Sequence, residues 1–266
     1  MARFVMVHGG FSGAWIWLPL IDTLREAGHV VEAFDLPGMG DDHTSASEVS
    51  LDSYAGRVCE VLAANSEPAI VVGHSMGGIV ATQAAARSPK RVAALVYVAA
   101  FLPKDGQSLL DLTKLPEGCG EQVLANVVVK GEPPVAVMPA AASRHALYRA
   151  CTEDVAAWAI ARQCPQPVSP LPMAVSIPPG ALNGINRYYV LCTESRAIPP
   201  PLQRRMIAVN TCADVIEIET DHTPQLSTTK ELAWALHHFA THSSAGAGRL
   251  ADRQDRADFR KAVLWD

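Results

Sequence analysis

The chain has 266 residues, of which 49% are hydrophobic, and its formal net charge is −5 at pH 7. This length and composition are sufficient for one large domain with a substantial apolar core, or for a domain that carries an insertion. The acidic balance argues against the basic surface that nucleic-acid binding requires, and no apolar run approaches the length of a membrane span.

Short apolar strands and helical stretches alternate over the first hundred residues. The expected strands are residues 4–7, 30–34, 92–99 and an apolar run that begins at Ala69. Between them, apolar spacing and composition predict helices at residues 15–27, 51–64 and 79–86. This alternation is typical of a parallel sheet with helices on its faces.

The alternation is interrupted between residues 102 and 184, where proline is frequent and two helical stretches occur, at 139–150 and 152–162. We interpret this segment as a cap over the carboxyl ends of the core strands. The core then resumes with a strand at 187–192, a helix at 200–209, a strand at 214–218 and a closing helix at 226–241. The expected division is a core in two parts (1–101 and 185–242), a cap (102–184) and a charged C-terminal tail (243–266).

A glycine–serine motif, Gly73-His74-Ser75-Met76-Gly77, connects the strand that begins at Ala69 to the helix that follows. A Ser at the apex of such a tight connection is held in a strained backbone conformation, with its hydroxyl clear of the sheet. A side chain at either glycine would collide with the neighbouring strand or helix. The motif therefore predicts a nucleophile elbow with Ser75 as the nucleophile.

Three further motifs accompany the elbow: His8-Gly9-Gly10, Asp35-Leu36-Pro37-Gly38 and Asp221-His222-Thr223-Pro224. With these pieces in this order, the chain resembles the α/β-hydrolase superfamily. More narrowly, it resembles the plant methylesterase and hydroxynitrile lyase group and its bacterial esterase relatives. The resemblance implies an α/β fold with a mostly parallel six-stranded sheet flanked by helices. It also implies a helical cap inserted after the strand that follows the elbow helix.

A serine hydroxyl needs a base within hydrogen-bond reach and a third group that orients the base. His222 follows the last expected strand, where the base of this fold belongs. The usual acid position lies four residues before Pro199 and holds Ser195, whereas relatives usually have Asp there. Three alternatives stay open for the group that orients His222. In the first, which we favour, Glu194 reaches the imidazole. In the second, Ser195 is a neutral hydrogen-bond partner, and in the third the site is altered or degenerate.

Two backbone N–H groups are candidates for the oxyanion hole. Met76 lies at the N-terminus of the elbow helix, and Gly10 lies in the turn after the first strand. The resemblance implies the same role for Gly10. The substrate pocket is expected to be mostly apolar, with Phe11, Met138 and Trp158 as candidate lining residues.

Ester hydrolysis is the activity that these motifs favour, with a small hydrophobic carboxylic ester or lactone as substrate and an acyl-enzyme on Ser75. Hydroxynitrile lyases of the group carry a Thr and a Lys at the positions of Gly9 and Thr223, so the cation that would handle cyanide is missing here. The alternatives are lyase-like or carbon–carbon hydrolase activity, and a catalytically weakened ligand-binding homologue.

No metal or other cofactor is expected. The six cysteines are scattered without a C-x-x-C pair, and His238 and His242 lack the H-E-x-x-H context of a zinc site. Because no hydrophobic leader is found before the first strand, we expect a cytoplasmic location. We expect no nucleic-acid or membrane partner, and an apolar cap helix leaves a homodimer open.

Overall fold

The computed structural model describes residues 1–241, and the expected tail at 243–266 lies outside the described residues. The core is a six-stranded sheet in the order β2-β1-β3-β4-β8-β9. Every neighbouring pair in it is parallel, as predicted. Its strands are β1 (Arg3–Val7), β2 (Val30–Ala33), β3 (Ala69–His74), β4 (Val92–Val98), β8 (Asn186–Cys192) and β9 (Asp214–Ile218).

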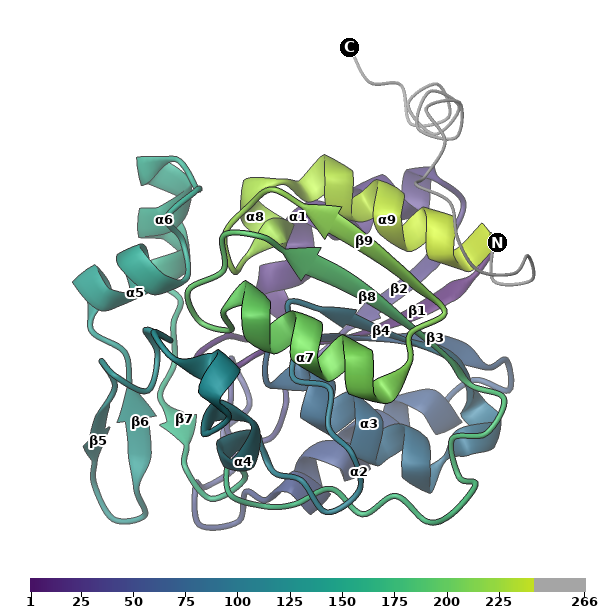
Figure 1. Cartoon of the computed structure of the whole chain (residues 1–266), viewed down its shortest axis with the longest axis horizontal. Helices are drawn as coiled ribbons and strands as arrows, with labels where there is room; N and C mark the ends of the chain where they lie inside the picture. The colour runs from purple at the N-terminus through teal and green to yellow at the C-terminus, as the bar shows by residue number, and fades with distance from the viewer. Residues whose placement is uncertain (242–266) are drawn as a thin grey trace.

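Helices cover both faces of this sheet (Figure 1). One face carries α1 (Leu18–Glu26), α8 (Pro224–Ser227) and α9 (Thr229–Thr241), and the other carries α2 (Leu51–Ala63), α3 (Gly77–Arg87) and α7 (Pro200–Asn210). Successive side chains of a strand point to opposite faces, so β1 divides between two apolar clusters. Phe4 and Met6 belong to the cluster under α1 and α9, whereas Val5 and Val7 belong to the other. Burial on both faces explains why the strands are continuous apolar runs.

Two predicted helices are interrupted. The first is preceded by a separate short helix, η1 (Ala14–Trp17), and the closing helix is divided into α8 and α9. The division occurs at Thr228, where φ is −142° and the backbone leaves helical geometry. A further short helix, η2 (Pro89–Arg91), precedes β4. Within residues 1–241, no helix combines the length and the apolar character that crossing a bilayer requires.

The segment between β4 and β8, which we call the cap, lies at the end of the sheet to which the arrows of β8 and β9 point (Figure 1). Its helices are α4 (Leu109–Thr113), η3 (Pro116–Gly118), α5 (Ala140–Ala146) and α6 (Glu153–Ile160). The cap also contains an antiparallel sheet of β5 (Val128–Lys130), β6 (Val135–Val137) and β7 (Gln166–Pro167). The sequence analysis did not predict this sheet, because strands of two or three residues are too short for an alternating pattern.

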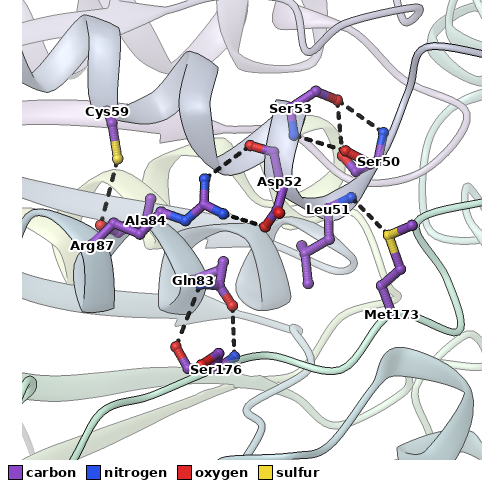
Figure 2. Close-up of polar contacts among 10 residues, drawn as sticks. All are labelled: Ser50, Leu51, Asp52, Ser53, Cys59, Gln83, Ala84, Arg87, Met173 and Ser176. Atoms are coloured by element: carbon purple, nitrogen blue, oxygen red, sulfur yellow. Dashed lines mark hydrogen bonds and ion pairs between the residues drawn. The ribbon is translucent and has the colours of Figure 1, made fainter.

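The segment that returns from the cap is attached to the core helices (Figure 2). Gln83 of α3 accepts a hydrogen bond from Ser176 N at 2.8 Å and donates one to Ser176 O at 3.4 Å. At the start of α2, Leu51 N donates to Met173 Sδ at 3.3 Å. The Gln83 side chain is buried, whereas Ser176 and Met173 are exposed, and these bonds tie the end of the cap to the core.

Candidate active site

Ser75 lies in the connection between β3 and α3. Its φ of 54° is in the left-handed region, which costs a residue with a side chain about 1–3 kcal/mol. The neighbouring strand supports this conformation, because Ser75 N donates to Val98 O at 3.3 Å. A Cβ at Gly73 would lie 2.6 Å from Gly77 O, and one at Gly77 would lie 2.6 Å from Val7 O. The geometry is therefore that of the nucleophile elbow predicted from the sequence.

The imidazole of His222 lies in the loop after β9 and lines the same cavity as Ser75. His74 donates from Nε2 to the carbonyl oxygen of His222 at 2.9 Å, which joins the His222 loop to the elbow. Burial lowers the pKa of His222 well below its ordinary value, and the nearby His74 ring lowers it further. His222 is therefore neutral at pH 7, which is the form that a general base requires.

The group that contacts His222 Nδ1 is a hydroxyl rather than a carboxylate. Ser195 Oγ lies 3.0 Å from Nδ1, and it accepts a hydrogen bond from Ile198 N at 3.2 Å. A carboxylate could only accept, so it would keep the imidazole proton on Nδ1. The Ser hydroxyl can instead donate to Nδ1, which places the proton on Nε2 and removes the lone pair with which a base would accept a serine proton. The catalytic tautomer is therefore permitted but not enforced.

The structure contradicts the prediction that Glu194 orients His222. The Glu194 carboxylate forms an ion pair with Arg149 of the cap, and both side chains are partly exposed. The opposite charge of Arg149 holds the Glu194 carboxylate away from His222, and Ser195, the next residue along the chain, contacts the imidazole instead. Asp221 is also engaged elsewhere, since it accepts hydrogen bonds from Ala150 N at 2.8 Å and from Thr223 N at 3.1 Å.

Two residues that line the cavity beside Ser75 carry the backbone N–H groups that were expected to form an oxyanion hole. These residues are Gly10 and Met76, and within residues 1–241 neither amide has a hydrogen-bond acceptor. Met76 is the N-cap residue of α3, where the helix dipole favours negative charge. His8 supports the turn: its Nδ1 donates to Gly9 O at 2.8 Å, and its Nε2 accepts from Leu36 N at 3.0 Å. The arrangement suits an oxyanion hole at Gly10 and Met76.

A cavity of about 180 Å³ lies between the core and the cap at Ser75. Phe11, a predicted pocket residue, lines it next to Gly10. Most of the cap lining is aliphatic and includes Leu109, Val123, Leu124, Val127, Leu147 and Leu171. Such a lining favours a hydrophobic ligand that is oriented by a few polar groups.

Two of the predicted pocket residues are wrong, because Met138 and Trp158 do not line this cavity. Met138 is buried in the apolar cluster that the cap shares with one face of the sheet. Trp158 packs edge-on against Trp15, with ring centroids 5.3 Å apart, and the Arg162 guanidinium lies 4.4 Å over its ring. The sequence analysis also missed Gln166, which lines the cavity from β7 and gives no motif signal.

Metal-binding chemistry has no support in the part of the chain that the structure describes. No group of three or more His, Cys, Asp or Glu side chains there could hold a metal ion. The six cysteines are unpaired, so none of them forms a disulfide.

Comparison with known proteins gives a second line of evidence, on the family to which the chain belongs. The model of the "Alpha/beta hydrolase family" matches residues 4–236. Over 250 residues the chain is 32% identical to methylesterase 7 of Arabidopsis thaliana, and the match covers 90% of this chain and 96% of that protein. It is 30% identical over 260 residues to salicylic acid-binding protein 2 of Nicotiana tabacum, with the same two coverages. The crystal structure of polyneuridine aldehyde esterase matches with a TM-score of 0.82 and 26% identity, over 90% of this chain and 99% of that chain.

Proposed function

The chain belongs to the alpha/beta hydrolase family and is a carboxylic ester hydrolase, and we propose that it cleaves a hydrophobic ester or lactone through an acyl-enzyme on Ser75. The observation that carries this proposal is that Ser75 and His222 line one cavity, while Ser195 Oγ contacts Nδ1 of the His222 imidazole. The aliphatic lining supports a hydrophobic substrate.

The reaction begins when Ser75 Oγ attacks the ester carbonyl and His222 Nε2 takes the hydroxyl proton. The oxyanion that forms accepts hydrogen bonds from Gly10 N and Met76 N. When the tetrahedral intermediate collapses, His222 gives the proton to the leaving alcohol and the acyl group stays on Ser75. A water molecule then attacks the acyl-enzyme with His222 as base, which releases the carboxylic acid and restores Ser75.

Ser195 makes this machinery weaker than a Ser–His–Asp triad. During each proton transfer His222 becomes an imidazolium, and a hydroxyl stabilises that charge less than a carboxylate does. Loss of the orienting carboxylate alone costs about 10⁴ in rate, while the oxyanion hole and substrate binding still support catalysis. We therefore expect slow but genuine turnover.

A hydroxynitrile lyase function has little support at the residues that would carry it. Thr223 occupies the position of the lyase cation, and its hydroxyl donates to Leu147 O at 2.8 Å. Gly9 occupies the position of the lyase Thr and supplies no hydroxyl. A second candidate, a ligand-binding hydrolase homologue with little turnover, is favoured by one observation, the neutral Ser195 at His222.

A fluorophosphonate probe separates the two candidates, because only an activated serine reacts with it. We expect labelling at Ser75, identified by mass spectrometry, together with hydrolysis of p-nitrophenyl butyrate and methyl phenylacetate. Ser75→Ala should abolish both readouts while the protein remains folded. A folded wild-type protein that is neither labelled nor active, yet binds such esters, would exclude the esterase and leave the binding function.

A further inference from the structure

We propose that Gln166 is a hydrogen-bond acceptor for the substrate and that it selects esters with a hydroxyl or N–H group on the carbon next to the carbonyl. This inference rests on the proposed esterase function. Gln166 lies in β7 of the cap, and its backbone pairs with Ala136 of β6. Its side chain is 1% exposed and lines the cavity that contains Ser75.

The orientation of the Gln166 amide is determined by two partners of its nitrogen. Nε2 donates to Tyr54 Oη at 3.2 Å and to Pro167 O at 2.8 Å. A flipped amide would place its oxygen against the Pro167 carbonyl oxygen, and two acceptors repel each other. Both protons of the nitrogen are thus used, and Oε1 is held at the opposite end of the amide.

That oxygen is the part of Gln166 that lacks a partner. Among the described residues, no donor reaches Gln166 Oε1, although the atom is buried. A buried acceptor without a donor is unfavourable, and native proteins rarely leave one unpaired. Tyr54 of the core and Pro167 of the cap hold the amide nitrogen, and Gln166 is a lining residue of the cavity. We therefore infer that the missing donor for Oε1 comes from a ligand in the cavity.

The position of Oε1 indicates which part of a substrate would reach it. A Cβ at Gly10 would lie 3.3 Å from Oε1, so the oxygen lies against the residue whose N–H is the proposed oxyanion donor. An ester carbonyl oxygen bound at Gly10 N would be repelled by a bare Oε1. A hydroxyl or N–H on the adjacent carbon removes this repulsion, because it can donate to Oε1 while the carbonyl oxygen stays in the oxyanion hole. The preferred substrates are therefore hydrophobic 2-hydroxy or 2-amino esters.

Matched pairs of esters test the proposal. Each enantiomer of methyl mandelate is compared with the corresponding enantiomer of methyl 2-methoxy-2-phenylacetate, which keeps the oxygen but cannot donate. We expect kcat/KM of the wild type to favour the better mandelate enantiomer by about tenfold or more over its methoxy analogue. In Gln166→Met the ratio should fall to about one, because the acceptor is gone. Tyr54→Phe is the control: Pro167 O, a main-chain acceptor, still holds Nε2 and disfavours the flipped amide, so Oε1 keeps its place and the preference should persist.

A wild-type ratio near one, or an unchanged ratio in Gln166→Met, would overturn the assignment. A binding measurement makes the test independent of turnover. Ser75→Ala should bind methyl mandelate more tightly than its methoxy analogue by a similar factor in calorimetry, and Ser75→Ala/Gln166→Met should bind the two alike. If the wild type hydrolyses neither ester and the fluorophosphonate fails to label it, the esterase function fails, and the binding ratio still decides the role of Gln166.

Discussion

Replacement of Ser195 by Asp should raise kcat, because a carboxylate at this position can only accept hydrogen bonds. In the wild type, Ser195 Oγ lies 3.0 Å from His222 Nδ1, and its hydroxyl can donate to that nitrogen. An Asp carboxylate would accept from Nδ1 and from Ile198 N, whose amide already donates to residue 195 at 3.2 Å. The imidazole would then carry its proton on Nδ1 and offer Nε2 to the nucleophile.

The size of the gain follows from two opposing effects. An orienting carboxylate is worth about 10⁴ in rate in Ser–His–Asp enzymes, and this sets the upper limit. Residue 195 is 3% exposed, so the new charge must be desolvated, and the two N–H donors compensate for only part of that cost. We therefore expect kcat to rise by about 10²–10³, which corresponds to about 3–4 kcal/mol of transition-state stabilisation.

The assay is steady-state hydrolysis of p-nitrophenyl butyrate, normalised by fluorophosphonate titration so that only folded sites are counted. Ser195→Asn is the matched control, because its amide has the size of the Asp side chain but no charge and can donate to Nδ1. It should not reproduce the gain. A folded Ser195→Asp variant whose kcat equals or falls below that of the wild type would refute this reasoning.

The pH profile provides a second readout of the same substitution. Burial holds the pKa of His222 well below its ordinary value in the wild type, so the base stays neutral into the acidic range. A carboxylate at residue 195 would favour the imidazolium and raise this pKa. The acidic limb of kcat/KM should therefore move to higher pH in Ser195→Asp but not in Ser195→Asn.

Three further predictions concern Glu194, Gly77 and His74. Glu194→Gln should change kcat by less than about twofold, because its carboxylate pairs with Arg149 on a partly exposed surface, where such pairs contribute about 0–1 kcal/mol to stability. Gly77→Ala should lower the free energy of unfolding by about 3 kcal/mol or prevent folding, since the added Cβ would lie 2.6 Å from Val7 O. The free energy of unfolding should also decrease as the pH falls from 6.5 towards 4, because burial lowers the pKa of His74 to about 4. Between pH 4 and pH 6.5 the unfolded chain binds a proton on His74, whereas the folded protein keeps this side chain neutral. The contribution of neutral His74 to the free energy of unfolding is therefore fully present above pH 6.5, and it amounts to at most about 3 kcal/mol.

Ester kinetics check the first of these, and a tenfold loss of kcat in Glu194→Gln would return the acid role to Glu194. Urea unfolding checks the second, with Gly56→Ala in α2 as the control, because a Cβ there has nothing within 4 Å. Equal stability of the two Ala variants would contradict the steric argument. For the third, urea unfolding of the wild type and His74→Gln is measured between pH 7.5 and pH 4.5. A profile that is flat in the wild type, or equally steep in the variant, would show that His74 is not the group responsible.

Local features of the active site could be predicted from the sequence because short-range sterics and periodicity determine them. The contacts that require glycine at positions 73 and 77 involve the turn itself and the strand beside it. The core strands are continuous apolar runs, since both of their faces are buried. Ser75 and His222 each follow an expected strand, and this was sufficient to predict that both lie at the carboxyl ends of parallel strands.

The partner of His222 and the lining of the pocket depended on tertiary structure. Residues 194 and 195 are neighbours in sequence, and their roles were separated by Arg149, a charge 45 residues away from Glu194 that holds its carboxylate. In the cap, residue type identified apolar candidates but not the direction in which each side chain points. Trp158 therefore faces Trp15, while Gln166, a polar residue in a two-residue strand, faces the cavity. Contacts between distant segments decide such directions, and no periodic pattern within one segment encodes them.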